Sequence, residues 1–444
     1  MLGDIATAAP QGPPPLTDND IALYQSASED MRVHALIAFA RAGQQEQAAE
    51  LLQRFPLTGP HAANRTLFIE GLILKGRHDL FGAARKFRSA LADDPKLTLV
   101  RSELAQVLVE LDENDSAAHH LRLLEADAPN AADAAGIRTF IDKIDAKKPY
   151  AFSGYVSVAP STNVNSGSNH SILSSDVFGP GFDPNGIITN QKQSGLGFSG
   201  GLSAGFSKKL NDRFQLVLGS GVNVNIYTDP QYNSASISES AELRYMFTDG
   251  YFGFGGTASQ NIAQPSLTSF EIGSHAYGPR VTASYQITQR DLINSSVSYE
   301  WRDYPYNGSL NRTSLHTDLA VTHAIDSTAN FTVFGGYDHV SNQDLAKAYS
   351  TYFGGVNVYK EFPFGLTVNA NAQTRISPFE APDIFTSTTR FDTRYIGSMT
   401  LTKRDFNFMG FAPSFNYTYT LNKSNVALFD YDSHAVNVSL TKDF

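Results

Sequence analysis

Three groups of residues have types that could do chemistry. Every second side chain of an extended strand shares a face, which puts His316, Asp318 and Thr322 together. A histidine beside an aspartate could act as a general base with its orienting acid, as in hydrolytic triads. The spacing places no nucleophile next to this pair, so a polar wall explains the residues better than a catalytic site does. We expect no enzyme activity.

The second group is a glycine pattern. Gly195, Gly197 and Gly200 match GxGxxG. In nucleotide-binding folds this pattern leads into a helix whose N-terminus meets the phosphate. Here it continues into GLSAGFSKKL at 201–210, which alternates like a strand. Small residues along a strand, and not a nucleotide site, are expected.

The third group could bind metal. His119 and His120 are adjacent, and neighbouring helical side chains point about 100° apart, so they do not converge on one ion. The acidic runs at 112–115 and 183–186 are typical of turns. Cysteine is absent and the net charge is −10, which removes thiol chemistry and argues against nucleic-acid binding. The sequence predicts no metal, no cofactor and no catalytic residue.

Two kinds of element must position the remaining residues, and the first is helical. Residues 20–148 are rich in Ala, Leu, Glu and Arg and repeat at a spacing of 34, as helical repeat proteins do. They resemble the tetratricopeptide repeat, whose small residues let two helices approach and whose proline ends the second helix. The repeat-signature positions are Leu67, Gly71, Leu74, Ala83, Phe87, Ala90 and Pro95, then Ala105, Leu108, Ala117, Leu121, Leu124 and Pro129. A plain helical bundle is the alternative.

The second kind of element is the strand. From residue 149 to 444, apolar and polar residues alternate with a period of two in segments longer than ordinary strands. We expect fourteen strands in a closed antiparallel transmembrane β-barrel, because closure leaves no sheet edge in lipid. Polar faces of three strands supply the candidate lumen residues Asn223, Asn225, Glu300, Arg302, Asn369, Asn371 and Arg375.

The connections and the chain end set the orientation. Short turns alternate with long connections, expected at 161–192, 263–275, 304–311, 342–348, 377–387 and 421–431, as in outer-membrane barrels. An even strand count puts both barrel ends in the periplasm, and the helical repeats with them. The terminal Phe444 is the expected signal to the barrel assembly machinery. Residues 1–19 are expected to form a flexible, Pro-rich arm without signal-peptide features.

Helical repeats followed by a fourteen-stranded barrel resemble the surface lipoprotein assembly modulators of Gram-negative bacteria, the type XI secretion family. The local likeness lies in the barrel start motif, Pro160, Asn163 and Asn165, although Thr162 stands where that family often has Asp. The resemblance implies an outer-membrane translocon that exports or displays client proteins, either surface lipoproteins or soluble relatives that capture haem or iron. The implied partners are the client, outer-membrane lipid and lipopolysaccharide, the barrel assembly machinery and periplasmic chaperones.

Two other functions remain open from the sequence. Polysaccharide exporters also join helical repeats to a barrel, although an acidic polymer would favour a lumen richer in Arg and Lys. A diffusion porin with an accessory domain is the third interpretation, because a polar lumen alone is sufficient for passive conduction.

Overall fold

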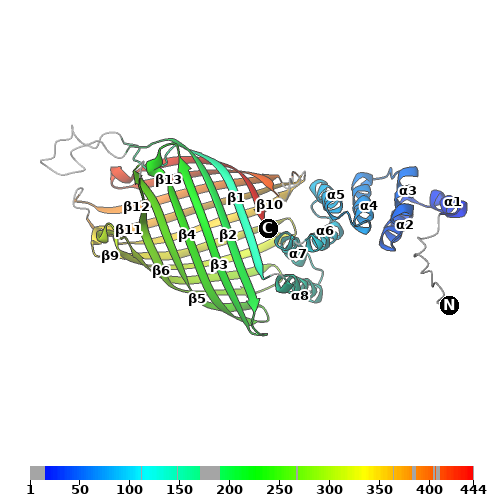
Figure 1. Cartoon of the computed structure of the whole chain (residues 1–444), viewed down its shortest axis with the longest axis horizontal. Helices are drawn as coiled ribbons and strands as arrows, with labels where there is room; N and C mark the ends of the chain where they lie inside the picture. The colour runs from blue at the N-terminus through cyan, green and yellow to red at the C-terminus, as the bar shows by residue number, and fades with distance from the viewer. Residues whose placement is uncertain are drawn as a thin grey trace, which may run out of the picture. The chain divides into compact units, whose positions relative to one another are not determined.

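A computed structural model describes residues 16–111, 113–147, 149–170, 191–266, 269–363, 365–382, 387–403, 406 and 411–443. Helices come first in this part of the chain and strands follow (Figure 1). The α-helices are α1 Asp18–Ser26, α2 Glu29–Arg41, α3 Gln45–Arg54, α4 Ala62–Gly76, α5 Leu80–Asp93, α6 Thr98–Glu110, α7 Asn114–Ala126 and α8 Ala131–Lys147. None of the described helices is both long and apolar enough to cross a bilayer.

Helices α1 to α6 belong to one compact unit, residues 1–113. Their starts follow local chemistry: Thr17 forms a capping box with Asp20, and Asp79 accepts the N–H of Gly82, which satisfies donors that the first helical turn leaves free. The core contains Leu36, Ile69, Phe87, Leu104 and Leu108, each fully buried.

A buried carboxylate also joins three of these helices. Glu103 of α6 accepts hydrogen bonds from Arg41 of α2 at 2.7 Å and from Lys75 of α4 at 2.8 Å. Two cations on one carboxylate offset the cost of removing its charge from water. The pairing therefore fixes how α2, α4 and α6 lie against each other.

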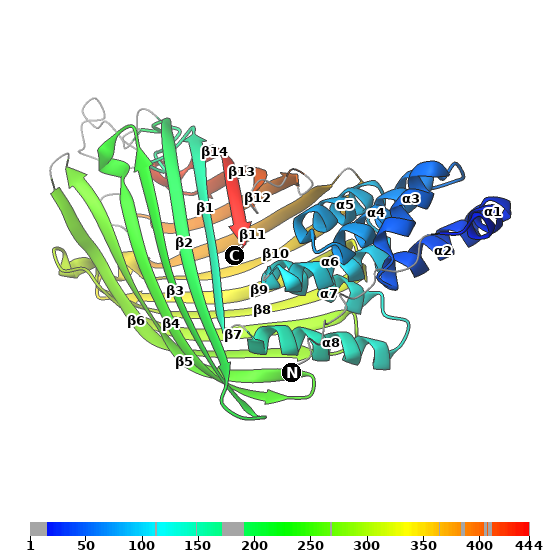
Figure 2. The ribbon, with the colours of Figure 1, turned by 45° about the vertical axis from the view of Figure 1, so that its right-hand side comes forward.

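The second unit contains α7, α8 and fourteen strands that form a closed antiparallel barrel in sequence order. The strands are β1 Tyr150–Ser161, β2 Gly195–Lys209, β3 Phe214–Tyr227, β4 Ser234–Phe247, β5 Gly250–Ser266, β6 Ser269–Gln286, β7 Asp291–Asp303, β8 Arg312–Asp326, β9 Ala329–Asn342, β10 Tyr349–Phe362, β11 Leu366–Pro382, β12 Thr389–Lys403, β13 Ala412–Ser424 and β14 Tyr431–Asp443. The expected count and closure are confirmed. Strands β1 and β14 lie side by side in Figure 2 and close the barrel.

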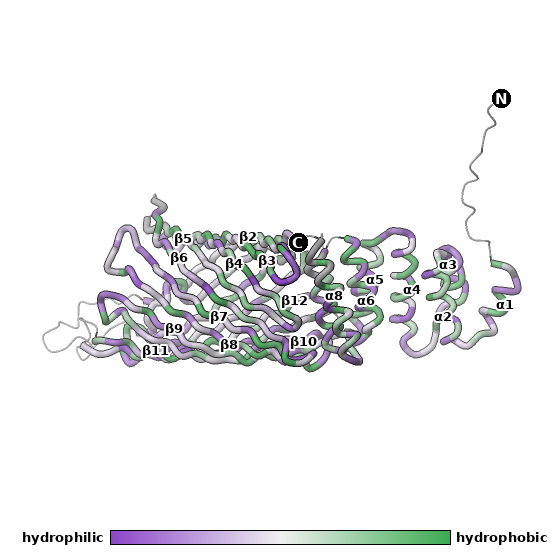
Figure 3. The backbone as a smooth tube through the Cα atoms, turned by 90° about the horizontal axis from the view of Figure 1, so that it is seen from below, coloured by the Kyte–Doolittle hydropathy of each residue, from purple (hydrophilic) through white to green (hydrophobic). Residues whose placement is uncertain are grey.

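Alternate residues of each strand face outward, and most of them are apolar. Leu202 is 69% exposed, Phe254 68% and Val156 62%, whereas a soluble protein would bury such side chains. The hydropathy of the chain accordingly alternates along the strands (Figure 3). Lipid therefore takes the place that a hydrophobic core has in a soluble domain.

Two of the expected long connections are shorter than predicted. The loop expected at 263–275 is mostly strand, because β5 runs to Ser266 and β6 starts at Ser269. The loop expected at 377–387 is shortened in the same way by β11, which runs to Pro382. Register shifts near Asn261 and Pro378 let these strands continue through irregular sequence, which is what β-bulges do.

Candidate functional site

The repeat-signature residues lie mostly in the interior of the helices. Gly71, Ala83, Phe87, Ala90, Ala105, Leu108, Ala117 and Leu121 are buried, whereas Leu67, Leu74, Leu124 and Pro95 are half-buried and Pro129 is exposed. A Cβ placed on Gly71 would come within 2.4 Å of the Phe87 ring. The absence of a side chain at 71 is thus what lets α4 and α5 approach. The residues that repeat at a spacing of 34 lie mostly within these helices. That the helices are tetratricopeptide repeats stays a prediction.

One side of the barrel lumen carries a run of small uncharged residues. The inward positions of β1 to β5 include Ser153, Ser203, Gly219, Gly221 and Ser240, which are register partners on neighbouring strands. Ser153 and Ser203 hydrogen-bond each other at 2.6 Å. These residues and their neighbours line a space of about 1000 Å³. The small residues offer hydroxyl and peptide groups, and Tyr155, Asn223, Arg280 and Glu300 also line the space.

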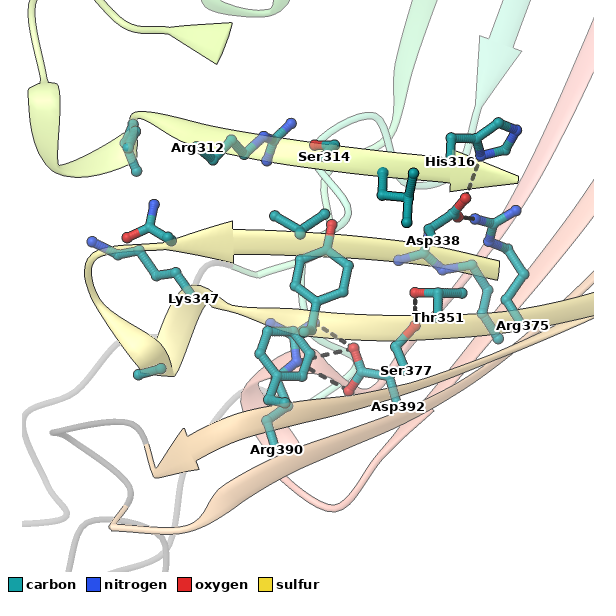
Figure 4. A pocket seen from close by; sticks show the side chains of 18 of the residues that line it. Arg312, Ser314, His316, Asp338, Lys347, Thr351, Arg375, Ser377, Arg390 and Asp392 are labelled. Carbon is teal, nitrogen blue, oxygen red and sulfur yellow. Dashed lines mark hydrogen bonds and ion pairs between the residues drawn. The ribbon is translucent and has the colours of Figure 1, made fainter. Parts of the chain in front are cut away.

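The opposite side of the lumen carries ion pairs. Asp338 of β9 lies between His316 of β8 and Arg375 of β11, with its carboxylate 2.5 Å from the Arg375 guanidinium and in contact with the His316 ring (Figure 4). Phe353 of β10 stacks against His316 and also lies under Arg375, at 4.6 Å from the guanidinium carbon to the ring centroid. Asp338 thus compensates the Arg375 charge across these strands, while Arg312 and Arg394 add further cations to the same wall.

A second ion pair lies nearer the outer end of the same wall. Arg390 of β12 pairs with Asp392 at 2.5 Å and lies over the rings of Phe379 and Phe429, at 4.6 and 3.5 Å. Phe429 belongs to a short 3-10 helix, η4 Ala427–Phe429. These residues, together with His316, Asp338 and Arg375, line a cavity of about 790 Å³ (Figure 4). An aromatic-clamped guanidinium holds the last outer loop against the barrel wall.

The candidate lumen residues all occupy inward positions of their strands. Asn223 accepts a hydrogen bond from Tyr155, and Asn225 accepts one from Ser199. Arg302 bonds Glu300 at 2.9 Å and Ser274 at 3.0 Å. Asn369 and Asn371 are register partners of Tyr359 and Asn357, and Arg375 pairs with Asp338 as described.

Sequence reasoning missed Asp338, Arg390 and Asp392. Each of them stands at one of the alternate strand positions that face the lumen, so the period of two could have identified them as lumen residues. Their partners could not be found that way, because Asp338 and Arg375 belong to strands separated by β10. Within the described residues, no group of three or more His, Asp or Glu side chains could hold a metal ion.

The seam between the first and last strands has a gap in its ladder. Register pairs run from Ser153 and Asp443 to Val158 and Val438, and resume only at Ser161 and Ala435. Pro160 lies in the interval. Proline has no backbone N–H to donate, so the barrel start motif weakens the seam at this point.

Beyond that gap, at the end of β1 and the start of β14, side chains and loop backbone join the two strands. Thr162 N–H donates to His434 O at 2.9 Å, and Asn169 N–H donates to Asp430 O at 3.0 Å. Lys192 pairs with Asp432 at 3.0 Å. We name this contact the outer clasp. Residues 161–170 and Lys192 lie on one side of it, and residues 427–434 lie on the other.

Asn163 is the central side chain of the outer clasp. It is 5% exposed. Its amide nitrogen donates to Gly167 O at 2.9 Å and to Asp432 O at 3.1 Å, and its oxygen accepts the Gly167 N–H at 2.8 Å. Asn165, half-buried, bonds Gly167, Gln191 and Gln193 within the first loop. Phe444, the expected assembly signal, lies outside the described residues.

The chain resembles known proteins over most of its length. The profile described as "Surface lipoprotein assembly modifier" matches residues 150–444. The chain is 21% identical over 399 residues to a surface lipoprotein assembly modifier of Pasteurella multocida, covering 84% of this chain and 75% of the relative. It is 23% identical over 397 residues to a hemophilin secretion modulator of Acinetobacter baumannii, covering 85% and 79%. A solved FadL homologue of Pseudomonas aeruginosa aligns with a TM-score of 0.41 and 13% identity, covering 74% of this chain and 94% of that one.

Proposed function

Because the chain belongs to the surface lipoprotein assembly modifier family, we propose that it moves client proteins across the outer membrane. The observation that carries this proposal is the family match over the entire barrel, residues 150–444. The names of its relatives indicate two client classes, surface lipoproteins and a hemophilin. The chain itself is an outer-membrane protein, and β1 starts and β14 ends at the same end of the barrel, which we assign to the periplasm.

The lumen supports a passive path for a polar chain. Serine hydroxyls on one side of the lumen can exchange hydrogen bonds with a passing backbone. The facing wall pairs part of its charge, as Asp338 does with Arg375, and also carries Arg312 and Arg394. Because the sequence carries no nucleotide-binding motif, we expect the driving force to come from client folding outside the cell or from other factors.

We assign the helices to client engagement in the periplasm. They precede β1 in the chain, and stacked helical repeats make extended surfaces that bind protein segments. Lipid and lipopolysaccharide surround the barrel, while the barrel assembly machinery, acting through Phe444, and periplasmic chaperones serve its biogenesis and its client. A Phe444 deletion should reduce heat-modifiable folded barrel far more than it reduces synthesis.

Co-expression with the protein encoded beside it tests the proposal. The readout is the amount of that neighbour that protease can reach on intact cells or that appears in the medium. We expect export with the full chain and none with residues 1–148 deleted, with barrel assembly checked by heat-modifiable migration. Unchanged export without the helices would refute their role.

The other two functions have separate outcomes in the same strains. A porin would conduct ions through the purified barrel and leave the neighbour's export unchanged on deletion of the gene. A polysaccharide exporter would alter surface polymer while the neighbour protein still reached the surface. Either result would overturn the client-translocon proposal.

A further inference from the structure

Glu239 lies on the outward, lipid-facing side of β4. Its neighbours of the same parity, Ile237 and Leu243, are 37% and 43% exposed on that face. Its register partners Ser220 and Ala258 belong to the outward faces of β3 and β5. Glu239 itself is exposed. A carboxylate therefore projects from a surface that is mostly apolar.

The register places Glu239 halfway across the membrane. Barrel strands tilt by about 40° from the membrane normal, so a row of register partners climbs through the bilayer from strand to strand. This row begins two residues after the periplasmic start of β1 and ends two residues before the outer end of β7, and Glu239 is on the middle strand. Its members are Phe152, Ala204, Ser220, Glu239, Ala258, Tyr277 and Trp301.

No other outward charge of the described strands lies so deep. The remaining outward acidic, basic or histidine residues are within three residues of a strand end, except His275, which is the register partner of the strand-end residue Asp303. Charged side chains near a strand end can reach headgroups and water. At mid-depth an ionised group is costly and marks a functional contact.

The surface around Glu239 is hollowed as well as charged. A depression of about 600 Å³ has Glu239 and the small residues Ala204, Ser220, Ala241, Gly256 and Ala258 in its outward lining, together with the larger Tyr150, Phe152, Phe206 and Leu218. Glu239 and the small residues lie on β2 to β5, the wall that faces the viewer in Figure 1. Small side chains let another backbone approach closely within a membrane, where a polar side chain then fixes the partner.

We propose that this depression, the Glu239 patch, docks another membrane-embedded protein whose buried segment carries a lysine or arginine at mid-depth. Charge complementarity selects that occupant, because a cation on the partner removes the cost of the exposed carboxylate. A second copy of this chain would bring two carboxylates together and increase the cost instead. Lipid chains supply no hydrogen-bond donor. Docking at the Glu239 patch requires only that the barrel lies in the outer membrane, and it does not depend on client transport.

Site-specific photo-crosslinking in intact cells tests the proposal. A benzophenone amino acid replaces Ser220 in the full chain, and a matched control carries it at Met399, an outward residue of β12 that is 41% exposed. The Ser220 probe is then combined with E239Q, which removes the charge, and with E239D, which keeps it. Heat-modifiable migration shows that every variant forms a barrel. Removing a lipid-exposed charge is not expected to harm folding.

We expect one protein adduct at Ser220 that is absent at Met399, with a yield reduced about tenfold by E239Q and retained in E239D, as a lost charged hydrogen bond implies. Once the partner is identified, E239K combined with glutamate at its membrane lysine or arginine should restore the adduct. An adduct between two copies, an adduct indifferent to E239Q, failure of the charge swap, or no adduct would each overturn the proposal.

Discussion

Replacing Asn163 with alanine should open the outer clasp without unfolding the barrel. The substitution removes three hydrogen bonds, two to Gly167 and one to Asp432 O. A neutral hydrogen bond contributes about 1 kcal/mol net, and the unpaired buried groups left behind add to the loss. The first loop and the clasp together should therefore lose about 3 kcal/mol, although only the bond to Asp432 O crosses the seam, while the ladder between Ser153 and Val158 keeps the seam closed.

Hydrogen exchange of the purified full chain in detergent measures this loss. The reporters are the amides of Thr162 and Asn169, which donate to His434 O and Asp430 O across the seam. Since 1.4 kcal/mol is a factor of ten, their protection should fall about a hundredfold. Amides within β8 and β9 should exchange as in the unmodified protein, because their ladder does not involve the clasp.

Asn165→Ala is the matched control. Asn165 is the same residue type two positions along and also makes three described hydrogen bonds, but it is half-buried and those bonds stay inside the first loop. Water can replace much of what it loses, so protection at Asn169 should fall by no more than about tenfold. Equal losses in the two variants, or unchanged protection in Asn163→Ala, would refute the reasoning.

Three further predictions concern the helices and the lumen. Gly71→Leu should lower the thermal stability of the helical region by about 1–3 kcal/mol, followed by circular dichroism, because it overpacks against Phe87. Hydrogen bonds, first of all from the Thr58 N–H, hold the pKa of Glu29 below its ordinary 4.5. The stabilisation by ionised Glu29 is present above about pH 4.5 and is lost as pH falls through the lowered pKa. Glu29→Gln should therefore flatten the acid dependence of helix melting. Asp338→Asn should change single-channel conductance of the barrel, because it leaves the Arg375 charge uncompensated.

Each of these has its own control. Gly136→Ala in α8, where an added Cβ would meet nothing within 4 Å, should leave melting unchanged or raise it slightly; a loss equal to that of Gly71→Leu would point to a general intolerance. If Glu29→Gln kept the original acid dependence of melting, Glu29 would not be its cause. Conductance that ignores Asp338→Asn would mean that this cavity does not limit ion flow.

The sequence by itself determined the fold class. Alternation with a period of two distinguishes strands from helices in residues 149–444, although it did not find the full length of β5, β6 and β11. Apolar residues on one face and polar residues on the other indicate that each strand separates lipid from water. The inward parity of Asn223, Glu300 and Arg375 follows from that alternation alone. Spacing of small residues similarly anticipated that Gly71 and Ala83 would be buried.

Only the tertiary structure decided which residues meet. Asn163 reaches Asp432 across 269 positions of sequence, a contact that exists because the barrel closes. Asp338 meets Arg375 through the registers of three strands, and a slip by one residue would turn each side chain to the other face. The depth of Glu239 follows from strand tilt and from the same registers. Local sequence encodes which way a side chain points, but closure and register set its height and its neighbours.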